Sequence, residues 1–521
     1  MEYGDIFRES YGDSFMKSDT SNHAQESFEG TYTDTEMVIG LVGAVGTPHK
    51  FVVDILRERL KSFNYKTTEI RVSHDVIGTL YDNIPKNFAS EFERISTYIE
   101  KGNESRKNSG DNSILAIGIS SEIYSKRLKD EQDRVKPMGR TTYIVNSLKH
   151  PDEVTALRNI YTDGFYLIGI HSDKERRQDY LTDEKNIDAA QATELIERDE
   201  DEVLGHGQHT RDTFHLADFF VHWDSDYDRF KKSLWRILDL IFGKPYTTPN
   251  FDEYAMFMAF ASALRSADLS RQIGAVIGRD NEIIAMGAND CPRAGGGLYW
   301  PVYSDDQREY IDEERGRDYV RGEDSNKIQQ KNMIDAILKN LDSSINKAEV
   351  EKTLLKSPIR DITEYGRAVH AEMEALLFCA RNTICTRGAT LYTTTFPCHN
   401  CAKHIIAAGI RKVVYVEPYP KSKAFEFHND AITPKDDLNS DIVAFVPFVG
   451  IGPRKFFDLF SMRLSAGFEI ERKDKRGSIL SWTLEQSHAR MQMLPCSYLE
   501  KETKATETFA VYQEGLENNN E

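Results

Sequence analysis

The alternation of apolar and polar residues divides the chain into two segments of mixed helices and strands. Short continuous apolar runs predict buried strands, and apolar residues spaced three or four positions apart predict helices with one buried face. In the first segment the predicted strands lie at 37–42, 114–119, 142–148, 165–170 and 217–223, and the predicted helices at about 51–63, 151–161 and 227–241. This order predicts an α/β domain with a doubly wound parallel sheet over residues 36–245.

A linker rich in proline and glycine, residues 243–250, leads into the second segment. The elements expected there are a helix at 253–268, a β-hairpin at 272–287, helices beginning at His370 and Cys398, strands at 390–394, 412–416 and 441–450, and a helix near 453–464. They predict an α/β/α domain with a mixed five-stranded sheet over residues 246–499. A charged insertion at about 298–365, with predicted helices at 327–341 and 347–355, interrupts this domain.

The two ends of the chain are polar. Residues 1–35 are rich in Ser, Thr, Asp and Glu and predict a flexible N-terminal arm. Residues 500–521 predict a disordered tail. The length of 521 residues is consistent with about three domains or fewer.

Composition narrows the classes of function. The formal net charge of −18 opposes broad electrostatic binding of DNA or RNA, although it allows a local basic pocket for one nucleotide. The six cysteines are sparse and unevenly spaced, unlike a secreted disulfide framework. The N-terminus does not resemble a signal peptide, and the longest apolar run, near 257–264, is too short to span a membrane. We therefore expect a soluble cytoplasmic protein with no membrane partner.

Two short motifs carry the chemistry of the second segment. Residues 370–372 give H-x-E and residues 397–401 give P-C-x-x-C, in the order typical of zinc-dependent nucleobase deaminases. One imidazole and two thiolates hold Zn²⁺ with an open fourth position, where the metal makes hydroxide available near neutral pH. The predicted ligands are His370, Cys398 and Cys401, and the predicted proton shuttle is Glu372.

The predicted secondary structure supports this interpretation. His370 and Cys398 each begin a helix, where partial positive charge and free N–H groups favour thiolates and orient ligands. Two other interpretations of C-x-x-C remain: a redox pair, which lacks a thioredoxin-like context here, and half of a structural zinc site. The structural site needs a fourth protein ligand, for which the candidates are Cys385, His399 and His404.

A glycine-containing loop follows the first predicted strand. It lies between that strand and a helix, which is the layout of a phosphate-binding loop. It departs from G-x-x-x-x-G-K-[ST], because proline replaces the second glycine and His49 replaces the lysine. The loop is therefore either a turn that packs a strand against a helix, or a nucleotide site with or without Mg²⁺. The residues of such a site would be Gly43, Gly46, Thr47, His49 and Lys50.

The segment around the zinc motifs resembles deoxycytidylate deaminases. The residues that carry this resemblance lie at 271–277, 286–292, 370–372 and 391–401. Ala288 and Asp290 depart from the family pattern. The resemblance implies hydrolytic deamination at C4 of a free deoxycytidine nucleotide. It also implies that Asn289 contacts the sugar or phosphate, and that Tyr415 and Tyr419 either lie near the pyrimidine or are packed aromatic residues.

The first segment is similar to small P-loop nucleotide kinases and dephospho-coenzyme-A kinases, including the paired arginines Arg176 and Arg177 after a late strand. Its acidic stretch 178–210 departs from the basic lid of such kinases, which favours a sensor or regulator. A kinase-like domain followed by a deoxycytidylate deaminase domain resembles the bacterial antiviral cytidine deaminases of phage defence. That resemblance spans about 38–464 and implies dCTP and dCMP as substrates, homo-oligomers and regulation by a small RNA.

Three further functions stay open. One is a housekeeping dCMP deaminase that supplies dTMP synthesis. Another is a deaminase of single-stranded DNA or RNA, which needs a basic channel with stacking aromatic residues and is disfavoured by the acidic composition. The third is a binding module, in which the glycine-loop domain senses a nucleotide or partner and deamination is its output.

Overall fold

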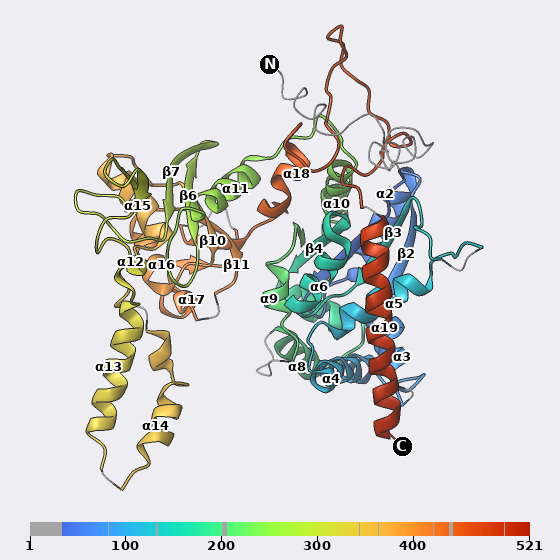
Figure 1. The fold of residues 1–521 in the computed structure, drawn as a ribbon, viewed down its shortest axis with the longest axis horizontal. Helices are drawn as coiled ribbons and strands as arrows, with labels where there is room; N and C mark the ends of the chain where they lie inside the picture. Colours follow the sequence, from blue (N-terminus) through green and yellow to red (C-terminus); the bar gives the residue numbers. More distant parts are fainter. Residues whose placement is uncertain are drawn as a thin grey trace, which may run out of the picture.

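The computed structural model describes residues 34–520 apart from 82, 132–133, 201–205, 343, 363, 420, 437–440 and 494. The predicted N-terminal arm therefore lies outside the described residues, except for Asp34 and Thr35. Figure 1 shows two α/β domains side by side, with a helical hairpin projecting from one of them. Within the described part of the chain, no helix combines the length and the apolar character needed to cross a bilayer.

Among the described residues, six strands form the first sheet, in the order β14-β5-β4-β1-β3-β2. These strands are β1 (Met37–Gly43), β2 (Lys66–Arg71), β3 (Thr141–Asn146), β4 (Phe165–Ser172), β5 (Phe219–Trp223) and β14 (Gly450–Ile451). All pairs are parallel except β14 with β5. Ile39 of β1 is the register partner of both Ile144 and Tyr166, so β1 is central. The predicted parallel sheet is confirmed, and β2 is an additional strand.

Helices cover both faces of this sheet, because successive side chains of a strand point to opposite faces. Ile39 packs with α2 (His49–Ser62) and α10 (Tyr227–Ile241). Val38 packs on the opposite face, which is covered by α5 (Ile114–Ser125), α6 (Pro151–Tyr161) and α19 (Pro495–Asn520). The remaining helices are α3 (Gly78–Leu80), α4 (Glu91–Ser109), α7 (Lys174–Asp179), α8 (Ala189–Glu200) and α9 (Thr210–Phe214). The doubly wound arrangement is confirmed.

Two predictions in this domain are wrong. Residues 114–119, predicted as a strand, begin α5, and residues 500–520, predicted as disordered, belong to α19. An apolar run without a clear period is compatible with a strand or with a helix that is buried on most sides. α5 is such a helix, because α4, α6 and α19 all pack against it.

The helix α19 lies alongside α5 (Figure 1). Its residues Tyr498, Ala505 and Phe509 are 2%, 5% and 4% exposed and belong to the same apolar core as Ile119. Their spacing of seven and four positions places them on one face of a helix. The polar composition of this segment obscured that pattern in the sequence.

The second sheet has the order β12-β13-β11-β10-β6-β7. Its strands are β6 (Gly274–Arg279), β7 (Glu282–Ala288), β10 (Thr390–Thr395), β11 (Lys412–Glu417), β12 (Ile432–Thr433) and β13 (Val443–Pro447). The pairs β6–β7 and β6–β10 are antiparallel and the others are parallel, so the sheet is mixed as predicted. It has six strands among the described residues instead of five, because the two-residue β12 extends one edge.

Helices also cover both faces of the second sheet. α11 (Phe251–Ala263) packs on one face, and α15 (Ala371–Arg381) and α16 (His399–Ala407) pack on the other. Gly287 of β7 allows α15 to approach closely, since a Cβ at this position would lie 2.2 Å from the carbonyl oxygen of Ala371. Two short helices follow, α17 (Ala424–Phe427) and α18 (Phe456–Phe460).

The predicted insertion forms a separate substructure of the second domain. It contains the hairpin of β8 (Val302–Ser304) and β9 (Glu309–Ile311), then α12 (Asp318–Arg321), α13 (Ser325–Lys339) and α14 (Lys347–Leu354). The two predicted helices are confirmed as α13 and α14. They form the hairpin that projects from the domain in Figure 1.

The second domain is connected to the first at both of its ends. At the entry, the buried Glu253 of α11 accepts hydrogen bonds from Arg236 Nη1 of α10 (2.7 Å) and from the Ile451 N–H of β14 (2.9 Å). At the exit, β14 pairs with β5, and α19 then packs on α5. β14 and α19 therefore pack with the first domain, so the chain leaves the second sheet well before the predicted boundary at 499.

Candidate active site

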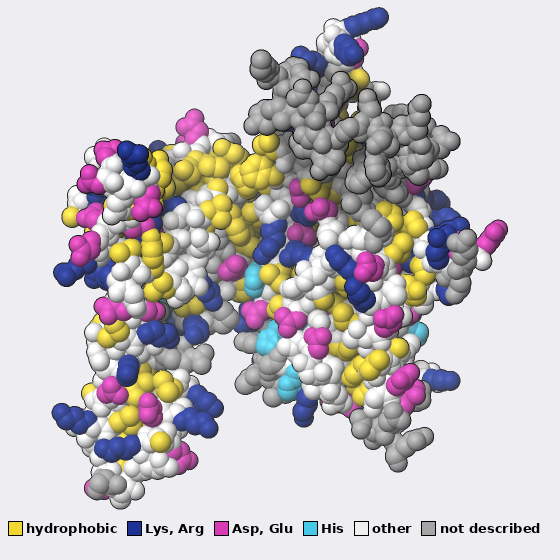
Figure 2. All heavy atoms as spheres, in the orientation of Figure 1, with side chains coloured by type: hydrophobic (Ala, Val, Ile, Leu, Met, Phe, Trp, Pro, Cys, Tyr) yellow, Lys and Arg dark blue, Asp and Glu magenta, His cyan; other side chains and the backbone are white. Residues whose placement is uncertain are grey.

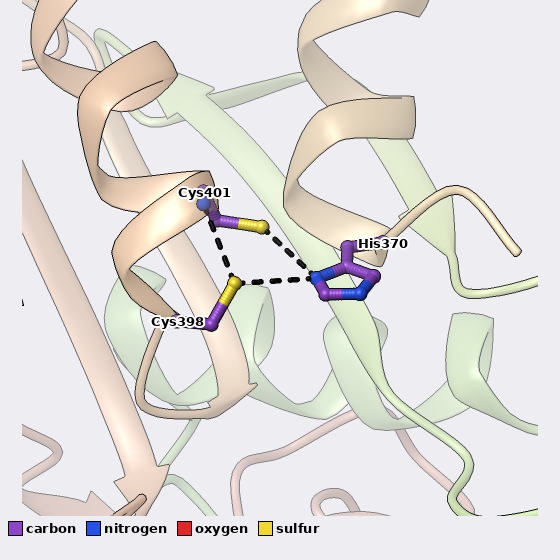
Figure 3. A group of neighbouring side chains, drawn as sticks. All are labelled: His370, Cys398 and Cys401. Carbon is purple, nitrogen blue, oxygen red and sulfur yellow. Dashed lines mark hydrogen bonds between the residues drawn. The ribbon is translucent and has the colours of Figure 1, made fainter. Parts of the chain in front are cut away.

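His370, Cys398 and Cys401 come together where two helices begin (Figure 3). His370 Nδ1 lies 3.4 Å from Cys398 Sγ and 3.3 Å from Cys401 Sγ. Around a tetrahedral zinc ion with usual bond lengths, a nitrogen and a sulfur ligand are separated by about 3.6 Å. The spacing of the three side chains therefore fits Zn²⁺.

The start of each helix positions these ligands. His370 is the N-cap of α15, and Cys398 is the N-cap of α16, with its sulfur accepting a hydrogen bond from the Cys401 N–H at 3.4 Å. The C-x-x-C spacing closes the first turn of α16, so both sulfurs face His370. The predicted placement of the two motifs at helix N-termini is confirmed.

The fourth ligand of a structural zinc site is not found among the described residues. Cys385 and His404 are exposed, and His404 Nδ1 bonds to the Asn400 carbonyl oxygen at 2.7 Å. The ring of His399 packs against Phe427, with 5.7 Å between ring centroids. The ligand group formed by His370 and the two cysteines includes none of the three candidates. Three protein ligands and one open position are typical of catalytic zinc.

The two thiols and the imidazole are electrostatically coupled. Hydrogen bonding from Cys401, followed by hydrogen bonding and charge from His370, lowers the pKa of Cys398 to about 4 against the effect of burial. The hydrogen bond to Cys398 and burial raise the pKa of Cys401 well above its ordinary value. Cys398 in turn raises the pKa of His370 to about 9. One thiolate is thus favoured by the protein itself, and binding of a divalent cation requires the loss of the remaining protons.

Glu372 lies beside the ligand group without belonging to it. Its Oε2 is 3.5 Å from Cys401 Sγ, and the residue is only 4% exposed. Burial raises the pKa of its carboxyl group above the ordinary value, in opposition to the charge of His370. A carboxyl group with a raised pKa can accept a proton and return it near neutral pH.

A cavity of about 280 Å³ opens at His370 and Glu372. This volume is close to the lower end of the range for small-molecule sites, about 300–1,000 Å³. The domain core and the insertion both contribute to its wall. The lining residues from the core include Arg271, Asn289, Thr395, Phe396 and Tyr419, and those from the insertion are Asp318, Asp324 and Asn326.

Two of the three predicted substrate-binding residues line this cavity. Asn289 does so, but its side chain is already engaged: Oδ1 accepts a hydrogen bond from the Ile273 N–H at 2.7 Å, and Nδ2 donates to the Arg271 carbonyl oxygen at 2.8 Å. Asn289 therefore holds the backbone that leads into β6. Tyr419 also lines the cavity, with the Arg271 guanidinium 5.7 Å from its ring centroid.

Tyr415 is not among the described residues that line the cavity. Its ring packs edge-on against Phe396, with centroids 4.9 Å apart and an interplanar angle of 89°. Burial raises the pKa of its hydroxyl to about 12. The alternative interpretation of Tyr415 as a packed aromatic residue is the one that agrees with these contacts.

Three cationic residues of the cavity wall were not predicted: Arg271, Arg367 and Lys421. Arg367 Nη1 donates to Asp318 of the insertion at 2.6 Å, which links the insertion to the segment before α15. Arg271 opens one of the segments that resemble the deaminase family, and Lys421 follows Tyr419 by two positions. No spacing rule distinguishes these cations from the many others in the sequence.

The glycine loop forms as predicted between β1 and α2, but one of its donors is already occupied. The Val45 N–H donates to Asp199 Oδ2 at 2.7 Å, and Lys149 Nζ donates to Asp199 Oδ1 at the same distance. Asp199 is fully buried. Backbone N–H groups of such loops, together with a lysine, are the groups that bind phosphate. In this structure the Val45 N–H of the loop and Lys149, which lies outside the loop, bind a carboxylate of the protein itself.

The predicted residues of the loop differ in their surroundings. Gly46 has φ of +87°, and a Cβ there would lie 2.6 Å from the Arg177 carbonyl oxygen, so both conformation and space require glycine. Gly43 ends β1, and Thr47 is buried next to it. Lys50 is exposed on α2. Nucleotide binding by this loop stays a prediction.

His49 occupies the place of the phosphate-binding lysine. Its Nδ1 lies 2.8 Å from Asn146 Oδ1 at the end of β3. Burial, and then the charge of Lys149, lower its pKa to about 4. A neutral imidazole is thus part of the folded first domain.

This lowered pKa predicts acid sensitivity of the first domain. The unfolded state, with a histidine pKa near 6.5, binds more protons than the folded state, so stability is complete above about pH 6.5 and falls towards pH 4. We expect His49 to account for a loss of about 2 kcal/mol at pH 5 relative to pH 8. Urea unfolding at both pH values measures this loss of stability. The difference in the free energy of unfolding between pH 8 and pH 5 should be smaller in H49Q than in the wild-type protein. It should be unchanged in H74Q, which replaces an exposed histidine. If the difference in the free energy of unfolding between the two pH values were equal in H49Q and H74Q, the assignment to His49 would be wrong.

Comparisons with known proteins agree with the site. Residues 249–417 match the family model described as the cytidine and deoxycytidylate deaminase zinc-binding region. Deoxycytidylate deaminase of Enterobacteria phage T2 is 53% identical over 55 residues, which are 11% of this chain and 29% of that protein. The deoxycytidylate deaminase of Mycobacterium phage D29 is 27% identical over 173 residues, 32% of this chain and 94% of that protein.

The corresponding enzyme of Pongo abelii is 28% identical over 165 residues, 32% of this chain and 63% of that protein. The chain thus spans less than a third of the phage T2 relative and less than two thirds of the Pongo relative. The matched region contains His370, Cys398, Cys401 and the buried Glu372. Residues 249–417 are therefore similar to the zinc-binding region of cytidine and deoxycytidylate deaminases.

Proposed function

We propose that this protein is a zinc-dependent hydrolase that converts free deoxycytidine nucleotides, dCMP and dCTP, into the deoxyuridine nucleotides. The observation that carries the proposal is the three-ligand group of His370, Cys398 and Cys401 with a buried carboxyl group beside it, at a cavity sized for one small molecule. The deoxycytidylate deaminases among its relatives support this class of substrate.

The chain's own residues account for the proton transfers. Zn²⁺ held by His370 and the two cysteines would supply hydroxide near neutral pH. Glu372 takes the proton that the attacking water loses, gives a proton to the ring nitrogen next to C4, and assists the departure of ammonia. Overall, water is consumed and ammonia released, so no other reactant is needed. Burial raises the pKa of the Glu372 carboxyl group above its ordinary value, which favours uptake of a proton during the reaction.

The cations of the cavity wall account for a charged substrate. Arg271 and Lys421 line the cavity with exposed side chains, and either can approach a phosphate group. Arg367 is held by Asp318, so we assign it to positioning the insertion against the cavity. Asp318, Asp324 and Asn326 of the insertion thereby form one side of the cavity wall.

Zinc-loaded protein incubated separately with dCMP, dCTP, CMP, CTP, deoxycytidine and single-stranded DNA tests the proposal. Loss of cytosine absorbance, confirmed by product analysis, is expected for dCMP and dCTP. Deamination of DNA alone, or of none of these compounds, would refute it. The R271A variant should raise KM for dCMP more than KM for deoxycytidine. R279A, which changes an arginine of β6 bonded to the Cys385 carbonyl oxygen, is the control and should change neither.

A polynucleotide substrate is the second candidate, since the insertion presents exposed aromatic residues. Trp300, Tyr303 and Tyr310 are 58%, 51% and 75% exposed, and such rings can stack on bases. However, residues 302–315 contain six carboxylates and only two arginines, which would repel a phosphate backbone. On the face shown in Figure 2, acidic and basic side chains are interspersed over both domains. The DNA arm of the experiment above decides this point.

We further propose that depletion of deoxycytidine nucleotides serves defence against phage. The order of the two domains, which resembles antiviral cytidine deaminases, supports this role. Phage propagation and the dCTP pool should both fall in cells that express the wild-type protein and not in cells that express E372A. Equal phage yields would favour the housekeeping alternative. Homo-oligomers, a regulatory RNA and a cytoplasmic location stay predictions of the resemblance and composition.

A further inference from the structure

A second cluster of metal-ligating side chains lies at the edge of the first sheet. His171 of β4 and His222 of β5 are register partners, and Asp173 follows β4 immediately before α7. His171 Nε2 lies 3.4 Å from Asp173 Oδ1, and His222 Nε2 lies 3.7 Å from Asp173 Oδ2. The three ligand atoms all lie within 4.8 Å of one another.

We propose that His171, Asp173 and His222 bind a divalent ion of the first transition series, such as Zn²⁺. Two imidazoles and one carboxylate suit such ions, with bonds of about 2.0–2.2 Å. Ligands on adjacent positions of one ion are then about 2.9–3.5 Å apart. The two observed histidine–aspartate separations, 3.4 and 3.7 Å, are close to this range. This inference does not depend on the proposed deamination.

One imidazole nitrogen of the cluster lacks a partner within hydrogen-bond distance. His222 Nε2 is shielded from solvent and has no hydrogen-bond partner among the residues that the structure describes. Its separation from Asp173 exceeds the usual hydrogen-bond distance. A shielded polar atom without a hydrogen-bond partner is unfavourable, and a metal ion at this position would satisfy it.

Arg176 is the cation that competes for Asp173. Its Nε lies 3.4 Å from Asp173 Oδ2. Its Nη1 is bonded to the Asp224 carbonyl oxygen at 2.6 Å, which fixes the guanidinium at the outer side of the β5 end. The contact uses one carboxylate oxygen and leaves Oδ1 to His171, so the carboxylate retains an oxygen for a metal ion.

The position of the cluster favours a site that also binds a ligand. It lies at the carboxyl ends of parallel strands, the edge at which open α/β sheets bind ligands. The residue before His171, Ile170, is the register partner of Gly43, so the cluster and the glycine loop share this edge. His171, His222 and Asp173 have side chains that are 32%, 33% and 45% exposed, so solvent can reach an ion there. The open positions of the ion would suit an anionic ligand.

Cobalt binding separates this site from the first one. Metal-free full-length protein is titrated with Co²⁺, and bound equivalents are counted by equilibrium dialysis while absorbance is recorded. Thiolate ligands give an intense charge-transfer band in the near ultraviolet, whereas a site of two histidines and one aspartate gives only weak visible bands. The wild-type protein should bind two equivalents, and C398S/C401S should bind one without the charge-transfer band.

The H171A/H222A variant decides the proposal. It should bind one equivalent of Co²⁺ and keep the full charge-transfer band. The D173N variant, which keeps the shape of the side chain, should give the same result. D173N replaces the double variant in the test if the double variant does not fold. H74A, which removes an exposed histidine of the same domain, should keep two equivalents. One equivalent in the wild-type protein, or two in both H171A/H222A and D173N, would overturn the second site without affecting the first.

Discussion

Replacing Glu372 by glutamine is expected to abolish deamination of dCMP while leaving the zinc content unchanged. Glutamine has the same shape as glutamate, but it cannot take a proton from water and return it to the ring or to ammonia. General acid–base catalysis contributes about 10²–10⁴-fold, so kcat should fall by at least this factor. Zinc should remain, because the ligand group consists of His370, Cys398 and Cys401.

The matched control is E374Q, two residues along the same helix. Glu374 is also buried, but it accepts a hydrogen bond from Arg381 at 2.6 Å. It is not among the described residues that line the cavity. Steady-state rates and metal analysis of the three proteins are compared. If E372Q carried a full complement of zinc and turned over dCMP at the wild-type rate, the assigned role of Glu372 would be wrong.

The second large effect concerns stability. A buried ionic network connects α19 to the start of β1 through Arg127. Arg127 Nε donates to Glu502 Oε2 at 2.6 Å, and Nη1 donates to Glu36 Oε1 at 2.7 Å. Both pairs are essentially fully buried. Burial opposes the charge of Arg127, but hydrogen bonds and charges from Glu502 and Glu36 outweigh it and raise the pKa of the guanidinium.

Replacing Glu502 by alanine is therefore expected to destabilise the first domain by about 3–5 kcal/mol, because removing one partner leaves a buried charge without full compensation. Urea unfolding followed by circular dichroism measures the change. E500A is the control: Glu500 lies on the same helix and pairs with Lys504 at 2.9 Å in solvent, so its removal should have little effect. Equal stability of E502A and E500A would mean that α19 is not part of the folded core.

The grouping of the three candidate zinc ligands was predictable because the sequence information that specifies it is local. H-x-E and P-C-x-x-C each lie within a few residues, and the start of a helix fixes the directions of His370 and Cys398. The cavity wall was less predictable. Asp318 reaches it through an insertion whose contacts depend on Arg367, 49 residues away in sequence. The substrate contact that the resemblance implies for Asn289 stays a prediction, and its hydrogen bonds to the backbone at 271 and 273 follow from the fold alone.

The first domain shows why long-range pairing limits such predictions. The glycine loop was recognised from its sequence, yet the partner of the Val45 N–H is Asp199, 154 residues away. The apolar run at 114–119 predicts a strand by its composition alone, because the helix α19 that covers it lies almost 400 residues away in a polar segment. A helix that is buried on most sides is recognised only when the elements that cover it are known.

The return of β14 and α19 to the first domain also sets an order of folding during synthesis. A ribosome completes residues 251–447, with every strand of the second sheet, before it makes residues 495–520. Until then Arg127 lacks Glu502, and the apolar face of α5 lacks its cover. Nascent chains with exposed apolar surface are prone to aggregate and to bind chaperones. The first domain, which is begun before the second during synthesis, is therefore completed after it.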